Sequence, residues 1–288
     1  MDFLSSFLIL DPKGAIGAAE LQLMVQALLF MLIVAVPVFI LLFFFAWRYR
    51  ASNKKAKYMP DWEHAKVDEL IWWAIPFEIV LILGALTWTS THELDPPKPL
   101  EGGEPLVVQV VALDWKWLFI YPEEDIASVN YVAFPVDRPV RFEITADAPM
   151  NAFWIPQLGG MLYAMTGMVN TLHLIAGEEG EYRGLSANYS GEGFAQMKFA
   201  AMAMSEEQFE EWTMERKASS RYLSRYEYEL LSEPGIVEQP MFYSDVENGL
   251  YNTIVTQFMS HDSFSTSASQ AAGHNGDVFE TLVPAPSH

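Results

Sequence analysis

The sequence has no cysteine in its 288 residues. The chain therefore forms no disulfide, and it offers no thiolate, the ligand that soft metal ions favour. This absence is compatible with an oxidising compartment, because no disulfide is needed, but it does not identify the compartment. No phosphate-binding glycine loop, Ser/His/Asp arrangement or metal-spaced histidine cluster stands out either.

Basic residues are also few. Lysine and arginine number 17 against 37 aspartates and glutamates, which gives a formal net charge of −20. Residues 92–288 hold 29 of the acidic and 10 of the basic side chains, so nearly all of the negative charge lies there. A surface of this sign disfavours nucleic acid and anionic lipid as partners.

Charge is absent from one long apolar run, Ala27 to Ala46. Its 20 residues make about 30 Å of helix, enough to cross a bilayer. A second run, Leu70 to Trp88, is interrupted by Pro76 and Glu78. A buried core helix or a signal peptide are the alternatives, but the first run is too long and the residues before it carry too little charge for a secretory signal. The pattern predicts a transmembrane hairpin over 21–91.

Basic side chains crowd the short connector between the two runs. They are Arg48, Arg50, Lys54, Lys55, Lys57 and Lys66. Basic residues in short loops mark the cytoplasmic side of a membrane. We therefore expect a bacterial inner-membrane protein with both termini and everything after residue 92 on the periplasmic side.

The rest of the chain changes character at residue 106. Short runs rich in β-branched and aromatic residues follow one another, separated by turn signals, and they predict an antiparallel β-sandwich. These runs are 106–113, 115–121, 129–134, 140–146, 171–175 and 197–204. Ser205 and Gln208 have the spacing of a capping box that opens a helix to about Lys217, and 221–231 and 246–259 resemble two further helices.

Six regions result from this pattern. They are an outer N-terminal segment (1–20), the transmembrane hairpin (21–91), a semi-rigid linker rich in proline and glycine (92–105), a β domain (106–204), a helical extension (205–260) and a tail expected to be disordered (261–288).

The stretch from Tyr182 to Met197 resembles the copper loop of subunit II of the haem-copper respiratory oxidases. In members that oxidise cytochrome c the loop reads Cys-x-Glu-x-Cys-x-x-x-His-x-x-Met, and one more histidine lies upstream. The corresponding residues here, which we call the former-ligand residues, are Asn151, Ser186, Asn188, Ser190, Phe194 and Met197. Only Met197 keeps a possible ligand, so we expect no metal and no redox cofactor in this chain.

The chemistry of these residues supports this expectation independently of the family resemblance. A mixed-valence copper pair needs thiolates and imidazoles; serine hydroxyls do not ionise near neutral pH, and phenylalanine has no lone pair. Gly184, Gly191 and Gly193 nevertheless suit a tight loop. The resemblance thus implies a membrane-anchored α+β chain, in which a two-helix hairpin precedes a cupredoxin-like sandwich kept for its shape.

Two acidic residues near the second apolar run are candidates for proton transfer. Glu69, Trp72 and Pro76 match the family's Glu-x-x-Trp-x-x-x-Pro entrance to that helix, where the glutamate stands at the cytoplasmic mouth of a proton channel. A carboxylate favoured by the helix dipole is the alternative, and Asp68 fits it equally well. Glu78 lies within the span, where an ionisable group is costly; a protonated acid bonded to a neighbouring subunit is favoured over a proton relay.

Three other residues are expected to be structural. Trp115 and Trp117 belong to a segment similar to the aromatic strand that, in copper-bearing relatives, passes electrons to the metal. Without copper they are interpreted as packing residues. His173, between two leucines, is expected to be a structural strand residue.

The resemblance implies subunit II of a quinol oxidase of the cytochrome bo or related type. Such a complex oxidises ubiquinol, reduces oxygen to water and moves protons, and its haems and single copper belong to subunit I. The expected partners are subunit I, the other subunits and membrane lipid. Some relatives carry a lipid-bearing cysteine before a segment like Leu10 to Gly14; here either the two helices are the only anchor, or the natural start differs.

Two alternatives remain at this point. One is a cytochrome c oxidase subunit, whose basic partner the acidic surface would suit but whose copper ligands are absent. The other is a stand-alone, membrane-anchored binding or assembly module, which would have no need of Glu69.

Overall fold

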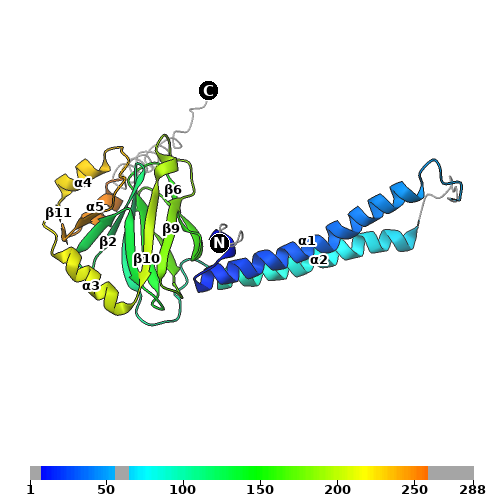
Figure 1. Cartoon of the computed structure of the whole chain (residues 1–288), viewed down its shortest axis with the longest axis horizontal. Coiled ribbons are helices and arrows are strands. Elements are labelled where there is room, and N and C mark those ends of the chain that lie inside the picture. Colours follow the sequence, from blue (N-terminus) through cyan, green and yellow to red (C-terminus); the bar gives the residue numbers. More distant parts are fainter. Residues whose placement is uncertain (1–7, 56–64, 259–288) are drawn as a thin grey trace, which may run out of the picture.

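Two long helices and a β domain make up the computed structural model, which describes residues 8–55 and 65–258 (Figure 1). A short 3₁₀ turn, η2 (Leu8–Leu10), precedes helices α1 (Ala15–Arg48) and α2 (Lys66–Glu93), which lie side by side and project from the domain. The predicted tail at 261–288 lies outside the described residues.

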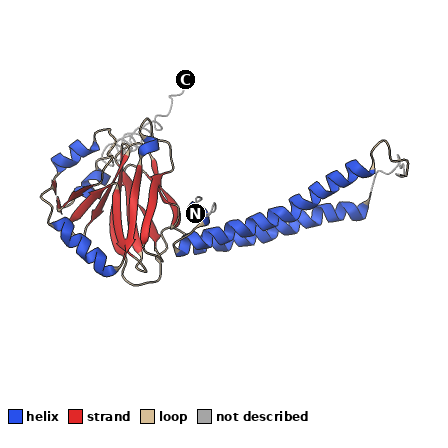
Figure 2. Cartoon of the chain, viewed as in Figure 1, coloured by secondary structure: helices blue, strands red, loops and turns tan. Residues whose placement is uncertain are grey.

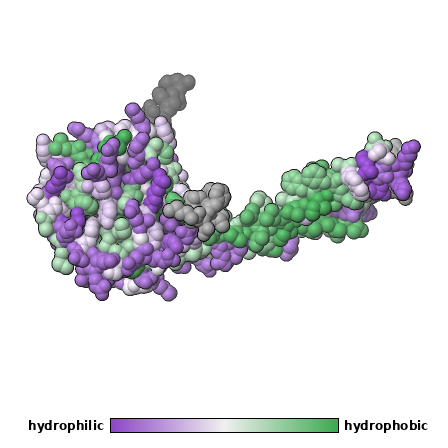
Figure 3. Space-filling view, viewed as in Figure 1, coloured by the Kyte–Doolittle hydropathy of each residue, from purple (hydrophilic) through white to green (hydrophobic). Residues whose placement is uncertain are grey.

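Both helices are long and apolar enough to cross a membrane. Their apolar side chains are largely exposed and form a continuous hydrophobic surface along the hairpin (Figure 3). Pro76 lies inside α2 without ending it. The predicted architecture of an apolar hairpin followed by a β domain with C-terminal helices is confirmed, and the chain is membrane-anchored.

The β domain consists of two packed sheets (Figure 2). Their strands are β1 (Leu106–Leu113), β2 (Lys116–Tyr121), β3 (Ile126–Val129), β4 (Tyr131–Pro135), β5 (Val140–Ala146), β6 (Asn151–Ile155), β7 (Gly159–Ala164), β8 (Asn170–Leu174), β9 (Gly180–Ser186), β10 (Lys198–Met204) and β12 (Met241–Tyr243). One sheet has the order β12-β3-β2-β1-β5-β8, and the other has the order β4-β10-β9-β6-β7.

The expectation of a wholly antiparallel sandwich was wrong for two strand pairs. β1 pairs with β5 in parallel, and β10 pairs with β4 in parallel. The chain between β1 and β5 passes through the opposite sheet, and such a crossover lets a strand return in its original direction. Strands β3, β6, β7, β9 and β12 were also missed. Two of them, β7 and β9, begin with glycines, which resemble turns.

An aromatic stack fills the space between the sheets. The rings of Phe153 and Phe199 lie nearly parallel, with centroids 5.1 Å apart, and Trp117 and Phe119 contact both rings. Gly184 leaves room for this stack, since a Cβ there would lie 2.1 Å from the Phe199 ring. Such contacts bury a large apolar area and fix ring geometry.

The C-terminal segment forms a second core on the outer face of the six-stranded sheet. Helix α3 (Glu206–Lys217) begins with the predicted capping box. Helices α4 (Arg225–Ser232) and α5 (Leu250–Thr256) begin later than predicted, because β11 (Tyr222–Leu223) and β13 (Asp245–Val246) pair with each other. Their buried side chains include Tyr228, Leu231 and Ile254, which cluster with Leu113 and Leu118 of the sheet.

Backbone contacts join the hairpin to the sandwich. The amide of Lys13 donates to the carbonyl of Gln157 (2.7 Å), and that of Gly17 donates to the carbonyl of Leu158 (3.0 Å). A Cβ at Gly159 would lie 2.7 Å from the Gly17 nitrogen, and Gly159 has a φ of +91°. No side chain fits between the two backbones. We call this contact the hairpin joint.

Replacing Gly159 with alanine should loosen the hairpin joint. The new Cβ meets backbone and the residue has a left-handed φ, so we expect a cost of roughly 1–3 kcal/mol. Trypsin cleavage after Lys13, whose amide is bonded to Gln157 in the joint, should become faster. Gly249→Ala is the matched control, because Gly249 has a φ of +77° with nothing within 4 Å of its Cβ position. Equal cleavage rates in the two variants would contradict the assignment.

Candidate functional site

The former-ligand residues gather at one end of the sandwich. Asn151 begins β6, Ser186 ends β9, and the others follow in the loop before β10. A single 3₁₀ turn, η3 (Phe194–Gln196), lies within this loop, at the end of the sandwich opposite α3 (Figure 2). The structure thus brings together residues that are 46 positions apart in the sequence, Asn151 and Met197.

Hydrogen bonds occupy the polar atoms at this site. Ser186 Oγ donates to Asn151 Oδ1 at 3.0 Å, and Asn151 Nδ2 donates to the Pro149 carbonyl at 2.7 Å. Asn151 is fully buried and Ser186 is 4% exposed. Asn188 Nδ2 donates to the Met150 carbonyl at 2.8 Å. The buried amide and hydroxyl groups therefore stabilise one another and the loop backbone.

The remaining former-ligand residues are packed apolar groups or weak contacts. Met197 is 1% exposed, and its sulfur lies 4.0 Å from Ser190 Oγ. The Phe194 ring packs edge-on against Tyr189, with centroids 5.7 Å apart. A packed phenyl ring thus stands in the place of an imidazole, and a serine hydroxyl stands in the place of a thiolate.

Trp115 fixes the loop from the opposite sheet. Its Nε1 donates to the Ser190 carbonyl at 3.0 Å, and its ring lies against Gly191 and Gly193. A Cβ at Gly193 would come within 2.3 Å of the indole, so only glycine fits there. Trp117 is fully buried in the core. Both tryptophans make packing contacts, in agreement with their interpretation as packing residues.

The residues at this site do not fit a copper centre. Two hydroxyls, two amides, a phenyl ring and a thioether include neither thiolate nor imidazole. Within residues 8–55 and 65–258, no three His, Cys, Asp or Glu side chains cluster as a metal site. His173, in β8, is 6% exposed, and its backbone amide donates to the Pro96 carbonyl at 3.1 Å. It helps to hold the linker.

The two candidate proton-transfer residues lie apart from each other. Glu69 and Asp68 stand in the first turn of α2, and Glu78 lies nine residues further along the same helix. At about 100° per residue, Glu69 and Glu78 point to opposite sides of the helix, about 13 Å apart along it. They therefore do not form one cluster within this chain.

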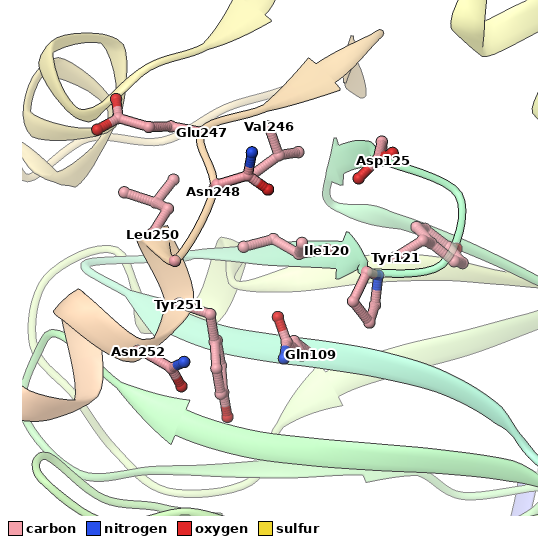
Figure 4. Close-up of a pocket in the computed structure, with 12 residues that line it drawn as sticks. Gln109, Ile120, Tyr121, Asp125, Val246, Glu247, Asn248, Leu250, Tyr251 and Asn252 are labelled. Atoms are coloured by element: carbon pink, nitrogen blue, oxygen red, sulfur yellow. The ribbon is translucent and has the colours of Figure 1, made fainter.

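A small pocket lies beside the C-terminal segment. It has a volume of about 150 Å³ and is lined by Gln109, Tyr121 and Asp125 together with the loop from Val246 to Asn252 (Figure 4). Small-molecule sites usually enclose about 300–1,000 Å³. This pocket is therefore too small for a substrate such as a quinol.

Known proteins similar to this chain are oxidase subunits. It is 49% identical over 252 residues to the cytochrome bo(3) ubiquinol oxidase subunit 2 of Pseudomonas aeruginosa, covering 87% of this chain and 76% of that protein. It is 47% identical over 254 residues to the ubiquinol oxidase subunit 2 of Acetobacter aceti, covering 87% and 82%. The chain belongs to the quinol oxidase subunit 2 family.

Two other comparisons concern parts of the chain. Residues 217–262 match the COX Aromatic Rich Motif. The periplasmic domain of subunit II of the Bradyrhizobium japonicum cytochrome oxidase overlaps 39% of this chain and 94% of its own, at 22% identity and a TM-score of 0.37. A chain of a heme-copper terminal oxidase dimer overlaps 48% of this chain and 99% of its own length, at 15% identity and a TM-score of 0.39.

We call the part of the chain that matches the COX Aromatic Rich Motif the aromatic-rich segment. It makes polar contacts that were not predicted from the sequence of this quinol oxidase subunit. The Tyr228 hydroxyl donates to Asp147, and Gln257 Nε2 donates to the other carboxylate oxygen of Asp147 at 2.6 Å. We call these three residues the Asp147 clamp. Burial raises the pKa of Asp147, and the two donors oppose that rise. The tyrosines at 222, 226 and 228 were the sequence signal that could have indicated this segment.

A second link holds the same segment to β2. Lys116 is 4% exposed, and its Nζ donates to the Glu233 carbonyl at 2.7 Å. Burial lowers the pKa of Lys116. Asn130 Nδ2 donates to the Val237 carbonyl at 2.9 Å, while its Oδ1 accepts from the Trp117 amide. Buried polar side chains therefore position the C-terminal segment in addition to apolar packing.

Ser186→Ala should destabilise the chain because it removes the hydrogen-bond donor of a buried side chain. Asn151 Oδ1 would lose its buried donor, at a cost of roughly 1–3 kcal/mol. Ser190→Ala is the control; its hydroxyl makes only the 4.0 Å contact with sulfur, so a change below about 0.5 kcal/mol is expected. Urea unfolding of the detergent-solubilised chain measures both. Equal losses would mean that the buried pair is not what stabilises the loop.

The folded chain should become less stable as pH rises, because the buried Asp147 carboxyl must then ionise. The folded-state pKa of Asp147 is raised, so its stabilising contribution is complete below the ordinary aspartate pKa of about 3.9 and is lost as pH passes through the raised value. Asp147→Asn does not titrate. The stability difference between the two proteins, measured by urea unfolding from about pH 4 to 7, should therefore change with pH. A stability difference that stays constant across this pH range would show that Asp147 does not titrate there.

Proposed function

We propose that this chain is the non-redox subunit II of a proton-translocating quinol oxidase, which passes electrons from ubiquinol to oxygen and forms water. The chemistry of the former-ligand residues carries the proposal. Their buried polar atoms are bonded within the site, and they include no thiolate or imidazole to hold a copper centre that would accept an electron from a cytochrome c. The names of the relatives at 47–49% identity support it.

The subunit's role is structural in this proposal. The haems and the single copper lie in subunit I, as does the quinol site. This chain binds subunit I, the other subunits and membrane lipid through the apolar hairpin, whose exposed side chains need such partners. The hairpin joint holds the sandwich in a fixed position on that anchor and so supports assembly.

Orientation follows from the basic connector. Arg48 ends α1, Arg50, Lys54 and Lys55 lie between the two helices, and Lys66 begins α2. Their charge favours a connector in the cytoplasm and an acidic β domain in the periplasm of a bacterial inner membrane. Glu69 then stands at the cytoplasmic end of α2, where it takes up protons at a channel entrance. Glu78 contacts a neighbouring subunit within the membrane.

The acidic exterior favours one alternative, a cytochrome c oxidase subunit with a basic electron donor. Purification of the complex in mild detergent, with this chain as the affinity handle, distinguishes a quinol oxidase from a cytochrome c oxidase. Haems, one copper per complex and oxygen uptake driven by quinol but not by reduced cytochrome c are expected. Two further coppers with cytochrome c turnover would refute the proposal, and a preparation without haem would indicate a stand-alone module.

Glu69→Ala should slow quinol-driven oxygen uptake by the assembled complex. The neighbouring Asp68→Ala is the matched control, because it removes the same charge from the same helix turn and the same dipole interaction. Turnover should fall in the Glu69 variant, most strongly at high pH where proton supply limits the rate, and stay near the original value in the control. Equal rates in both variants would remove the proton-uptake assignment.

A further inference from the structure

An open groove lies between α3 and the exposed edge of the five-stranded sheet. Its volume is about 550 Å³. The floor is apolar and is formed by Tyr131 of β4, Met202 and Met204 of β10, and Trp212 of α3. We call it the α3 groove. It lies at the end of the sandwich opposite the former-ligand residues and away from the hairpin (Figure 1).

The floor of the α3 groove is a rigid aromatic surface. The Tyr131 and Trp212 rings are stacked, with centroids 6.0 Å apart, and Phe209 stacks against Trp212 at 5.9 Å. The capping box fixes the first turn of α3, and Phe209 and Trp212 pack this helix against the core between the sheets. Fixed aromatic faces favour a cation placed above them.

The rim of the α3 groove is acidic. Glu179, Glu211 and Glu215 line it, and all three are exposed. Arg216 is the nearby cation, and its charge is engaged by Glu215 at 2.6 Å and by the Phe242 ring at 4.4 Å. Glu181 stands directly opposite Met202 in the strand pairing. The groove therefore has a negative rim above an apolar floor.

Charge decides which occupant suits this groove. Residues 1–7 and 259–288, the outer segments beyond the described structure, contain no lysine or arginine. A second copy of the chain would bring its own excess of acidic side chains, and anionic lipid would be repelled. We infer that the α3 groove docks a segment of another protein in which arginine or lysine alternates with apolar side chains.

Such a segment matches the groove at two points. Its cations would meet the rim carboxylates and the aromatic faces, while its apolar side chains would cover the methionines of the floor. This interaction does not depend on the oxidase activity, because the groove contains none of the residues assigned to proton uptake or to the former-ligand loop.

Peptide binding to the assembled complex tests the inference. The probe is a fluorescein-labelled hexapeptide of alternating leucine and arginine, and its partner probe has glutamate in place of arginine. Fluorescence anisotropy at about 150 mM salt limits long-range charge effects. Photoreactive leucine in the probe identifies the contact by cross-linking, which should fall on α3 and β10.

Two charge-matched variants separate the groove from the general acidity of the surface. Glu211→Gln with Glu215→Gln removes two rim carboxylates, one of them paired with an arginine. Glu229→Gln with Glu238→Gln removes two exposed carboxylates elsewhere, one also paired with an arginine. Peptide affinity should fall at least about tenfold in the first variant and change less than about twofold in the second.

Three results would overturn the inference. They are equal losses in the two variants, equal binding of the glutamate peptide, and no binding or cross-linking to α3 in the assembled complex. Quinol-driven oxygen uptake should be the same in both variants, so a failed docking test leaves the proposed oxidase function standing.

Discussion

The hairpin joint is the constraint on which the position of every other part depends. The first amides of a helix have no partner inside the helix, and here the N-cap, Gly14, supplies no side-chain bond. The Leu158 carbonyl, in the turn between β6 and β7, accepts the Gly17 amide instead, and the Gln157 carbonyl holds Lys13 just before the helix. The sandwich thereby caps the membrane helix. This requires glycine at 14, 17 and 159, because the two backbones touch.

The site at the other end shows how a metal-type loop can persist without metal. A buried polar group is stable only when it is bonded, and Ser186 and Asn151 bond each other. Trp115 and the glycines opposite it hold the loop from outside, and Phe194 and Met197 fill apolar space. Packing and hydrogen bonding thus hold this loop in place.

The aromatic-rich segment completes the domain. The outer face of the six-stranded sheet carries Val111, Leu113, Leu118 and Ile120, which would be exposed without α4 and α5. Polar side chains at Asp147, Lys116 and Asn130 set where the segment lies on that face. Within residues 8–55 and 65–258, no helix covers the α3 groove on the second sheet, and its apolar floor lies beneath an acidic rim.

The sequence by itself determined the two apolar helices, six of the strands and the absence of copper ligands. Each depends on local composition or on residue chemistry, which a sequence displays directly. The capping box at Ser205 was predictable for the same reason. Strand direction, the glycine-led strands, the hairpin joint and the Asp147 clamp were decided only by the tertiary structure. They join residues such as Gly17 and Gly159, or Asp147 and Tyr228, whose chemistry is ordinary until long-range packing brings them into contact.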